Sequence, residues 1–210
     1  SGGDITNTGT LDIEGVATFT VAGGRSITVA SGSNDFTATP VFSSGGTIGD
    51  VTIRDNTALA FGALTISGDL TATVLNGAVT QTGALVVPGT TTITASGQNI
   101  TLNNASNNFA TIGVTGADVK IRDAGAVALG ASTVSGTYLV TAVSGGDITN
   151  TGTLDIEGVA TFTVAGGRSI TVASGSNDFT ATPVFSSGGT IGDVTIRDNT
   201  ALAFGALTIS

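Results

Sequence analysis

The stretch TLDIEGVATFTVAGGRSITVA (residues 10–30) decides the fold class of this chain. Apolar and polar residues alternate within its three short phrases, TLDIE, ATFTV and SITVA, and glycine-containing breaks separate the phrases. Alternation with a period of two is typical of a β-strand that has one buried and one solvated face. No apolar stripe at helical spacing lasts long enough for a helix elsewhere in the chain. The sequence therefore predicts an all-β protein.

An exact tandem repeat extends outward from this stretch. Residues 144–210 repeat residues 1–67 letter for letter, so residues 1–143 form one complete tile and residues 144–210 begin an identical second tile. Strand phrases run unbroken through residues 137–150, where the copies meet. We therefore expect one continuous solenoid without a domain break at this junction.

Two weaker sub-repeats lie inside the tile, at approximately residues 3–76 and 77–145. DVTIRD at 50–55, for example, returns as DVKIRD at 118–123. A shorter phrase, Gly-x-(Leu/Ser)-x-(Ile/Val)-x-Gly, starts at Gly9, Gly62, Gly83, Gly130 and Gly152. The gaps between these starts indicate short coils of roughly 20 residues or a little more. Repeats of this length are typical of solenoids. Three short strands per coil, three coils per sub-repeat and about six coils per tile is the simplest count.

Stacking such coils predicts a three-sided parallel β-helix, with like strands about 4.8 Å apart, so that one tile advances about 29 Å. A β-sandwich array is the alternative fold. It is disfavoured because self-similarity at such a short period is typical of solenoids and not of Greek-key sandwiches.

Composition excludes several classes of protein. The net charge is −9, and no basic stripe exists to neutralise phosphates, so nucleic acid and anionic membranes are poor partners. Although 40% of the residues are hydrophobic, they alternate, and no run is long enough to cross a bilayer. The absence of Cys removes disulfides as a source of stability. The acidic balance of the tile favours solubility, with bridging by divalent cations as the alternative interpretation.

The run GALTISGDLTATVLNGAVTQTGALVVPGTTTITASGQNITLNNASNNF (62–109) resembles the repeat region of filamentous-haemagglutinin-like exoproteins, large bacterial adhesins exported by two-partner secretion. The resemblance covers nearly the whole chain and concerns only the shaft of that family. It implies a right-handed β-helical shaft, secretion to the extracellular space or the bacterial cell surface, and service in attachment, aggregation or biofilm. The implied partners are further tiles or copies, end to end or lateral, and cell-surface glycans or exopolysaccharide.

Arg-Asp pairs recur at the end of one strand phrase, at Arg54-Asp55, Arg122-Asp123 and Arg197-Asp198. We expect corners in which the Asp accepts backbone N–H groups and the Arg points outward; a carbohydrate-binding or catalytic pair is the alternative. Lys120 replaces Thr52 in one sub-repeat only, and we expect it to be a solvated outward side chain.

Thr and Asn patterns have structural and functional interpretations. Thr residues form outward pairs at strand spacing, at Thr18/Thr20, Thr71/Thr73 and Thr92/Thr94. An array of such Thr side chains could order water, although Arg54 interrupts it. The Asn-rich segments 31–36 and 99–109 predict side chains that hydrogen-bond along a corner of successive coils. Asn99 and Asn104 also match the N-glycosylation acceptor pattern. In a bacterial shaft we expect these matches to be accidental. No calcium-loop spacing occurs.

The expected function is therefore that of a structural shaft of an extracellular fibre or filamentous adhesin. The alternative is a polysaccharide-binding or polysaccharide-cleaving β-helix protein, and an ice-binding solenoid is a remote one. An enzyme is not expected, because the chain has no His, no long loop to wall a cleft and no acidic cluster that escapes duplication. We accordingly predict no catalytic, cofactor-binding or metal-binding residue and no cofactor.

The strand register makes specific predictions about side-chain direction. Phe19, Ile53, Leu64, Ile66 and Phe109 should point inward, and Thr18, Thr52, Thr65 and Arg54 outward. Ser1 and Ser210 fall inside the repeat pattern, so we expect end coils with unpaired strand edges, within a longer molecule or a stacked filament.

Overall fold

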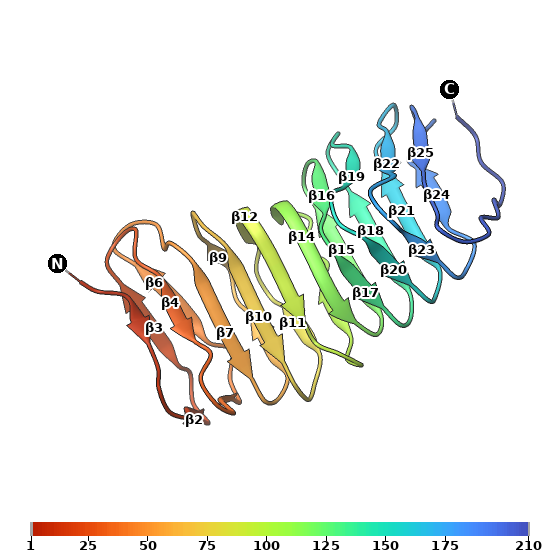
Figure 1. Cartoon of the computed structure of the whole chain (residues 1–210). Coiled ribbons are helices and arrows are strands. Elements are labelled where there is room, and N and C mark those ends of the chain that lie inside the picture. Colours follow the sequence, from red (N-terminus) through yellow and green to blue (C-terminus); the bar gives the residue numbers. More distant parts are fainter. Residues whose placement is uncertain (1, 210) are drawn as a thin grey trace.

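A computed structural model describes residues 2–209, so Ser1 and Ser210 lie outside the described residues. Over this range the chain is all-β, and its parallel strands stack into a β-solenoid of about nine turns with about three strands per turn (Figure 1). The near strands β7, β10 and β12 run downward in Figure 1 as the chain advances from left to right, which is a right-handed winding. This is the hand expected of parallel crossovers. The predicted fold class is confirmed.

Within residues 2–209 the largest sheet has 14 strands, most of them on one continuous path. That path contains, in order, β1 (Ile5–Thr6), β4 (Ile27–Val29), β7 (Val51–Asp55), β10 (Leu70–Val74), β12 (Leu85–Thr94), β14 (Asn108–Gly116), β16 (Val127–Leu129), β19 (Ile148–Asn150), β22 (Ile170–Val172) and β25 (Val194–Ile196). Beside it lie β9 (Leu64–Thr65), β17 (Ser132–Val134), β20 (Leu154–Ile156) and β23 (Asp178–Phe179).

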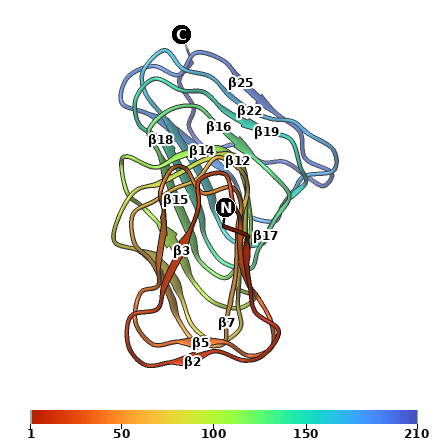
Figure 2. The same ribbon diagram turned by 90° about the vertical axis from the view of Figure 1, so that its left-hand side faces the viewer.

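The remaining strands form three smaller sheets. The seven-stranded sheet contains β8 (Leu59–Phe61), β11 (Val79–Gln81), β13 (Ile100–Leu102), β15 (Val119–Asp123), β18 (Tyr138–Ala142), β21 (Ala160–Val164) and β24 (Val184–Ser187). Two short sheets in the first coils pair β2 (Asp12–Ile13) with β5 (Asp35–Phe36), and β3 (Thr18–Val21) with β6 (Val41–Ser44). Figure 2 looks along the stack and shows the coils following one another around a common interior.

The number of coils per tile differs from the sequence-based count. β1 and β19 occupy the same place in the two copies, and seven strand-to-strand steps separate them along the large sheet. The expected six coils are therefore one too few, because some coils are shorter than assumed: Val51 already pairs with Leu70, and Ile112 with Leu129. At about 4.8 Å per coil, a tile advances about 34 Å, not about 29 Å.

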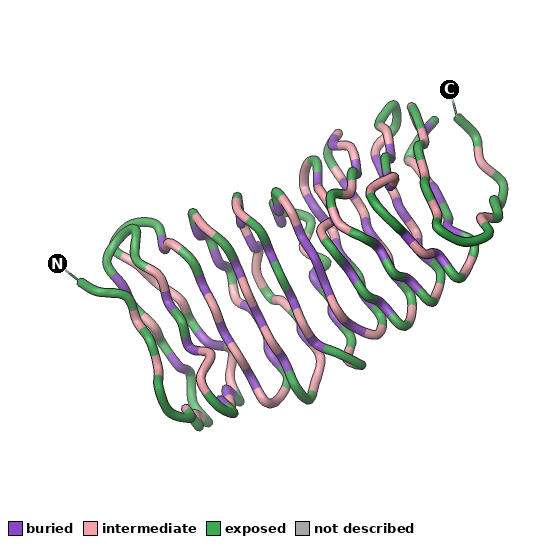
Figure 3. The backbone as a smooth tube through the Cα atoms, viewed as in Figure 1, coloured by how far each residue is buried: buried purple, intermediate pink, exposed green. Residues whose placement is uncertain are grey.

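Buried residues alternate with more exposed residues along most of the strands (Figure 3). Ile53 and Phe109 are fully buried, Leu64 and Ile66 are nearly so, and together with the other inward residues they form one apolar core. Thr18 and Thr65 are exposed, while Thr52 and Arg54 are partly exposed on the outer face. The predicted inward and outward directions are confirmed for these residues.

Identical sequences in the two copies acquire different burial according to the coils around them. Phe19 is only partly buried in the first coil, whereas its copy Phe162 is fully buried. Phe61 lies against Gln81 of the next coil and is 1% exposed; its copy Phe204 is 55% exposed. Burial of the core therefore depends on stacking, since a single coil cannot cover its own apolar face.

The seam between the copies has regular pairing on both sides. β18 ends at Ala142 and pairs with β15 before it and β21 after it, while β19 begins at Ile148 and pairs with β16 and β22.

The described residues include no helix that is long and apolar enough to pass through a bilayer.

The two DV(T/K)IRD motifs of the first tile lie on different sides of the solenoid. β7 carries the first motif and pairs with β4 and β10 in the 14-stranded sheet. β15 carries the second and pairs with β13 and β18 in the seven-stranded sheet. The sub-repeat therefore reproduces local structure but moves it from one side of the coil to another.

Candidate functional site

Most of the buried polar residues in the described part of the chain lie in what we call three-coil corners, Thr91 and Ser132 being exceptions. Each corner stacks an amide side chain, a buried Asn in the next coil and an Asp in the coil after that. The first corner is Asn7, Asn34 and Asp55; the middle corner is Gln81, Asn107 and Asp123; the last corner is Asn150, Asn177 and Asp198. Two local motifs build every corner, Asn-x-Phe in one coil and Arg-Asp in the following coil.

The buried Asn of each corner is hydrogen-bonded through both its Oδ1 and its Nδ2 atom. The Nδ2 of Asn34 donates to the carbonyl oxygen of Val29 at 2.8 Å, and its Oδ1 accepts the backbone N–H of Leu11 at 3.0 Å. Asn107 makes the same bonds with Leu102 and Leu85, and it also exchanges two 2.8 Å bonds with the amide of Gln81. Hydrogen bonding of Asn side chains along a corner was predicted and is confirmed; the part played by Gln81 was not foreseen.

The Asp of each corner links two coils. Asp123 Oδ2 accepts the N–H of Phe109 in the preceding coil at 2.7 Å, and Oδ1 accepts the N–H of Gly125 at 2.7 Å. Burial raises the pKa of the Asp123 carboxyl above its ordinary value, against the lowering effect of these two bonds. The prediction that the Asp of each Arg-Asp pair accepts backbone N–H groups is therefore confirmed.

The Arg side chains point away from these corners. Arg54 and Arg122 alternate with inward neighbours in β7 and β15, and both are partly exposed. In each, the Nε atom is buried and has no hydrogen-bond partner. A guanidinium that is not bonded to the adjacent carboxylate makes a poor Arg/Asp catalytic pair, because such a pair depends on charge-assisted bonds.

A second row of polar side chains, which we call the edge ladder, precedes the strands of the large sheet. Asp4 Oδ1 accepts the N–H of Ser26, Ser26 Oγ accepts the N–H of Asp50, and Asp50 Oδ1 accepts the N–H of Asp69. Asp69 Oδ1 in turn accepts the N–H of Thr90 at 2.7 Å. Each side chain thereby satisfies a backbone group of the coil above it. Sequence reasoning missed this ladder because its members are about one coil apart.

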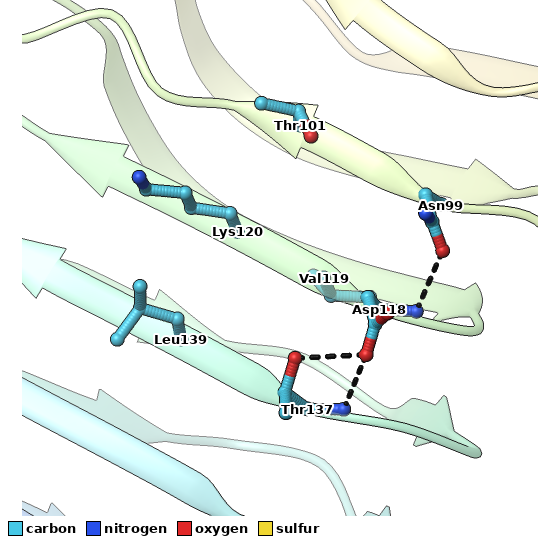
Figure 4. A pocket seen from close by; sticks show the side chains of 7 residues that line it. All are labelled: Asn99, Thr101, Asp118, Val119, Lys120, Thr137 and Leu139. Atoms are coloured by element: carbon cyan, nitrogen blue, oxygen red, sulfur yellow. Dashed lines mark hydrogen bonds between the residues drawn. The ribbon is translucent and has the colours of Figure 1, made fainter.

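A shallow hollow of about 250 Å³ lies on the seven-stranded sheet around Lys120 (Figure 4). Its other lining residues are Asn99, Thr101, Asp118, Val119, Thr137 and Leu139. Asp118 Oδ1 accepts both the N–H and the hydroxyl of Thr137 at 2.8 Å, and these bonds hold the pKa of the carboxyl below its ordinary value. The hollow therefore offers the ammonium group of Lys120, the hydroxyl groups of the Thr side chains and the amide of Asn99. It also contains the carboxylate of Asp118, which stays ionised.

The glycosylation patterns have structural uses here. Asn99 Oδ1 accepts the N–H of Asp118, and Asn104 Oδ1 accepts the N–H of Ser106.

Threonine side chains form two outward rows on the large sheet. The first row contains Thr28, Thr52, Thr71 and Thr92 and ends at Gly113. The second contains Thr73, Thr94, Thr115 and Thr133, and Arg54 adjoins it at Thr73. The predicted Arg is thus found in the array, so the ordered hydroxyl surface extends over only part of the tile.

Comparison with protein families gave one match. The model described as repeats of unknown function (DUF5649) matches residues 1–43, 48–115 and 116–186. The second and third segments begin just before DVTIRD and DVKIRD, so the family unit corresponds to the sub-repeat and not to the whole tile. No curated protein and no solved structure matches the chain.

Proposed function

This chain belongs to the DUF5649 repeat family, and from its tandem β-solenoid stack we propose that it forms the structural shaft of an extracellular fibre, of the filamentous-haemagglutinin-like kind. In this proposal the shaft projects from the cell surface and serves in attachment, aggregation or biofilm formation. Its partners are further tiles or copies, end to end or side by side, and surface glycans. No enzymatic activity is part of the proposal.

The observation that supports this proposal most strongly is that identical surfaces recur at a fixed spacing along one continuous stack of coils. Residues 144–210 reproduce residues 1–67, and their strands on the large sheet lie seven coils further along. A repeat of this kind suits a molecule whose length and regularity matter, because each added tile extends the shaft by about 34 Å.

The chemistry of the surface favours a structural role over catalysis. General acid catalysis at a carboxyl needs a raised pKa in a cleft, yet the carboxyl in the hollow, Asp118, has a lowered one. The carboxyls with raised pKa, Asp55 and Asp123, are fully buried and bind backbone N–H groups. Neither group is placed to protonate a substrate.

Polysaccharide binding is the second candidate, and the hollow at Lys120 favours it. An ammonium beside Thr and Asn side chains can bind the hydroxyl and carboxylate groups of an acidic sugar.

Electron microscopy of cells that produce the protein tests the proposal. Antibodies against the tile should label unbranched surface fibres whose axial repeat is about 34 Å or a simple multiple. Deleting the gene should remove the fibres and reduce attachment or aggregation. Labelling confined to the cell interior, or a compact particle without an axial repeat, would refute the proposed role.

A further inference from the structure

The first and last corners contain a pair of carboxylates that compete for one hydroxyl. The Oγ1 of Thr57 lies 2.9 Å from Asp35 Oδ1 and 3.3 Å from Asp55 Oδ1. In the last corner the hydroxyl of Thr200 lies 3.3 Å from both Asp178 and Asp198. A hydroxyl has one proton, so it cannot satisfy both carboxylates.

The buried member of the first pair also has an unsatisfied oxygen. Asp55 is fully buried, and its Oδ2 has no hydrogen-bond partner; Oδ2 of Asp198 likewise has none. The groups that act on the Asp55 carboxyl are Thr57, Phe36 and the charge of Asp35, and no basic side chain is among them. An unpaired buried carboxylate is costly, and a second carboxylate beside it increases that cost.

The middle corner provides an internal comparison. Asn108 stands where the first corner has Asp35, and Gly125 stands where it has Thr57. Both oxygens of Asp123 are hydrogen-bonded there, to Phe109 and Gly125. The unsatisfied oxygen thus occurs in the corners that hold two carboxylates and does not occur in the corner that holds one.

We propose that the Asp35–Asp55 pair and its copy, the Asp178–Asp198 pair, each bind a calcium ion, with the Thr57 or Thr200 hydroxyl oxygen as a further ligand. A divalent cation neutralises both carboxylates and occupies the free acceptor, which a shared hydroxyl cannot do. Asp35 and Thr57 are partly exposed, so water can complete the coordination shell from the solvent side. Asp12, paired with Asp35 across β2 and β5, adds negative charge nearby.

The ligands come from different coils, which explains why no calcium-loop spacing appears in the sequence. Asp35 lies in one coil and Asp55 in the next, joined by backbone bonds such as that from Asn56 to Asn34. Calcium would therefore bind adjacent coils to each other, once in every tile.

Terbium luminescence and calorimetry with CaCl₂ on the whole 210-residue chain test the inference. The parent should bind at both pairs and melt at a higher temperature in CaCl₂ than in chelator. Asp35→Asn should remove one of the two sites, and Asp35→Asn with Asp178→Asn should remove both and abolish the calcium-dependent shift. These variants should fold, because the middle corner naturally has Asn at this position.

Matched variants distinguish this site from general attraction to an acidic surface. Glu14→Gln with Glu157→Gln removes the same charge from exposed positions and should leave both sites intact. Asn108→Asp with Gly125→Thr should create a third site in the middle corner. Binding that is absent, or that persists unchanged in the double Asp variant, overturns the proposal. So does a melting temperature that rises on acidification but ignores CaCl₂, since the pair would then hold a proton.

Discussion

At the scale of single residues, the corner Asp is both a structural link and a source of pH sensitivity. Asp123 is held by two short backbone bonds, yet burial dominates its pKa and raises it above 3.8. The folded state therefore binds a proton at Asp123 more tightly than the unfolded chain does. The resulting stabilisation is complete below the unfolded pKa and is lost as the pH rises through the folded pKa.

The free energy of unfolding should accordingly increase as the pH falls from neutrality toward 3.8, in buffer without divalent cations. Urea denaturation at several pH values measures this slope. Asp123→Asn should reduce the slope and also lower the stability, because the new NH₂ group faces a backbone N–H donor. Asp118 has the opposite sign, because its pKa is lowered, and its contribution is lost only below 3.8. An unchanged slope in Asp123→Asn would show that another group is responsible.

Ile53 tests the strand register with a single substitution. It is fully buried in β7, whereas its neighbour Thr52 lies on the outer face. Ile53→Asp should destabilise the chain by more than about 3 kcal/mol, because it places an unpaired charge in a dry interior. Thr52→Asp should change the stability by less than about 1 kcal/mol. If the two variants melted alike, the assigned register would be wrong.

At the scale of elements, glycine at the corners permits close stacking of coils. A Cβ on Gly146 would collide with the backbone nitrogen of Ala126 in the coil below, whereas a Cβ on its copy Gly3 would meet no atom within 4 Å. The two glycines have the same neighbours in sequence, so only stacking distinguishes them.

Gly146→Ala should therefore destabilise the chain by about 1–3 kcal/mol or more, because the coil below must shift. Gly3→Ala should be neutral within about 0.5 kcal/mol. Thermal or chemical denaturation of the two single variants provides the comparison. Equal effects would mean that the coils at the junction do not approach each other as closely as described.

The elements also show which parts of the structure follow from sequence. Alternation in TLDIE and ATFTV is local, so strands, inward residues such as Ile53 and the solenoid itself were predictable. The coil count was not, because the coils differ in length: Ile27 pairs with Val51, Val51 with Leu70, and Ile112 with Leu129. The carboxylate pair at Asp35 and Asp55 was equally hidden, since its members lie in different coils and meet only after stacking.

At the scale of the whole molecule, the structure is a shaft in which the tile sets the spacing of every surface feature. Each sub-repeat moves its DV(T/K)IRD strand to another side of the coil, and the full tile returns it to the first side, as β7 and β25 lie in the same sheet. The tile, and not the sub-repeat, is thus the smallest unit that repeats the surface.

The distance between equivalent points in the two copies tests this account most directly. The chain contains no Cys, so spin labels can be placed at Thr18→Cys and Thr161→Cys, which are the same outer position in β3 and β21. Pulsed electron spin resonance should give one narrow distance distribution at about 34 Å, for seven coils at about 4.8 Å. A distribution centred at about 29 Å, the advance of only six such coils, would contradict the seven-coil tile, and a broad distribution would contradict a continuous rigid shaft.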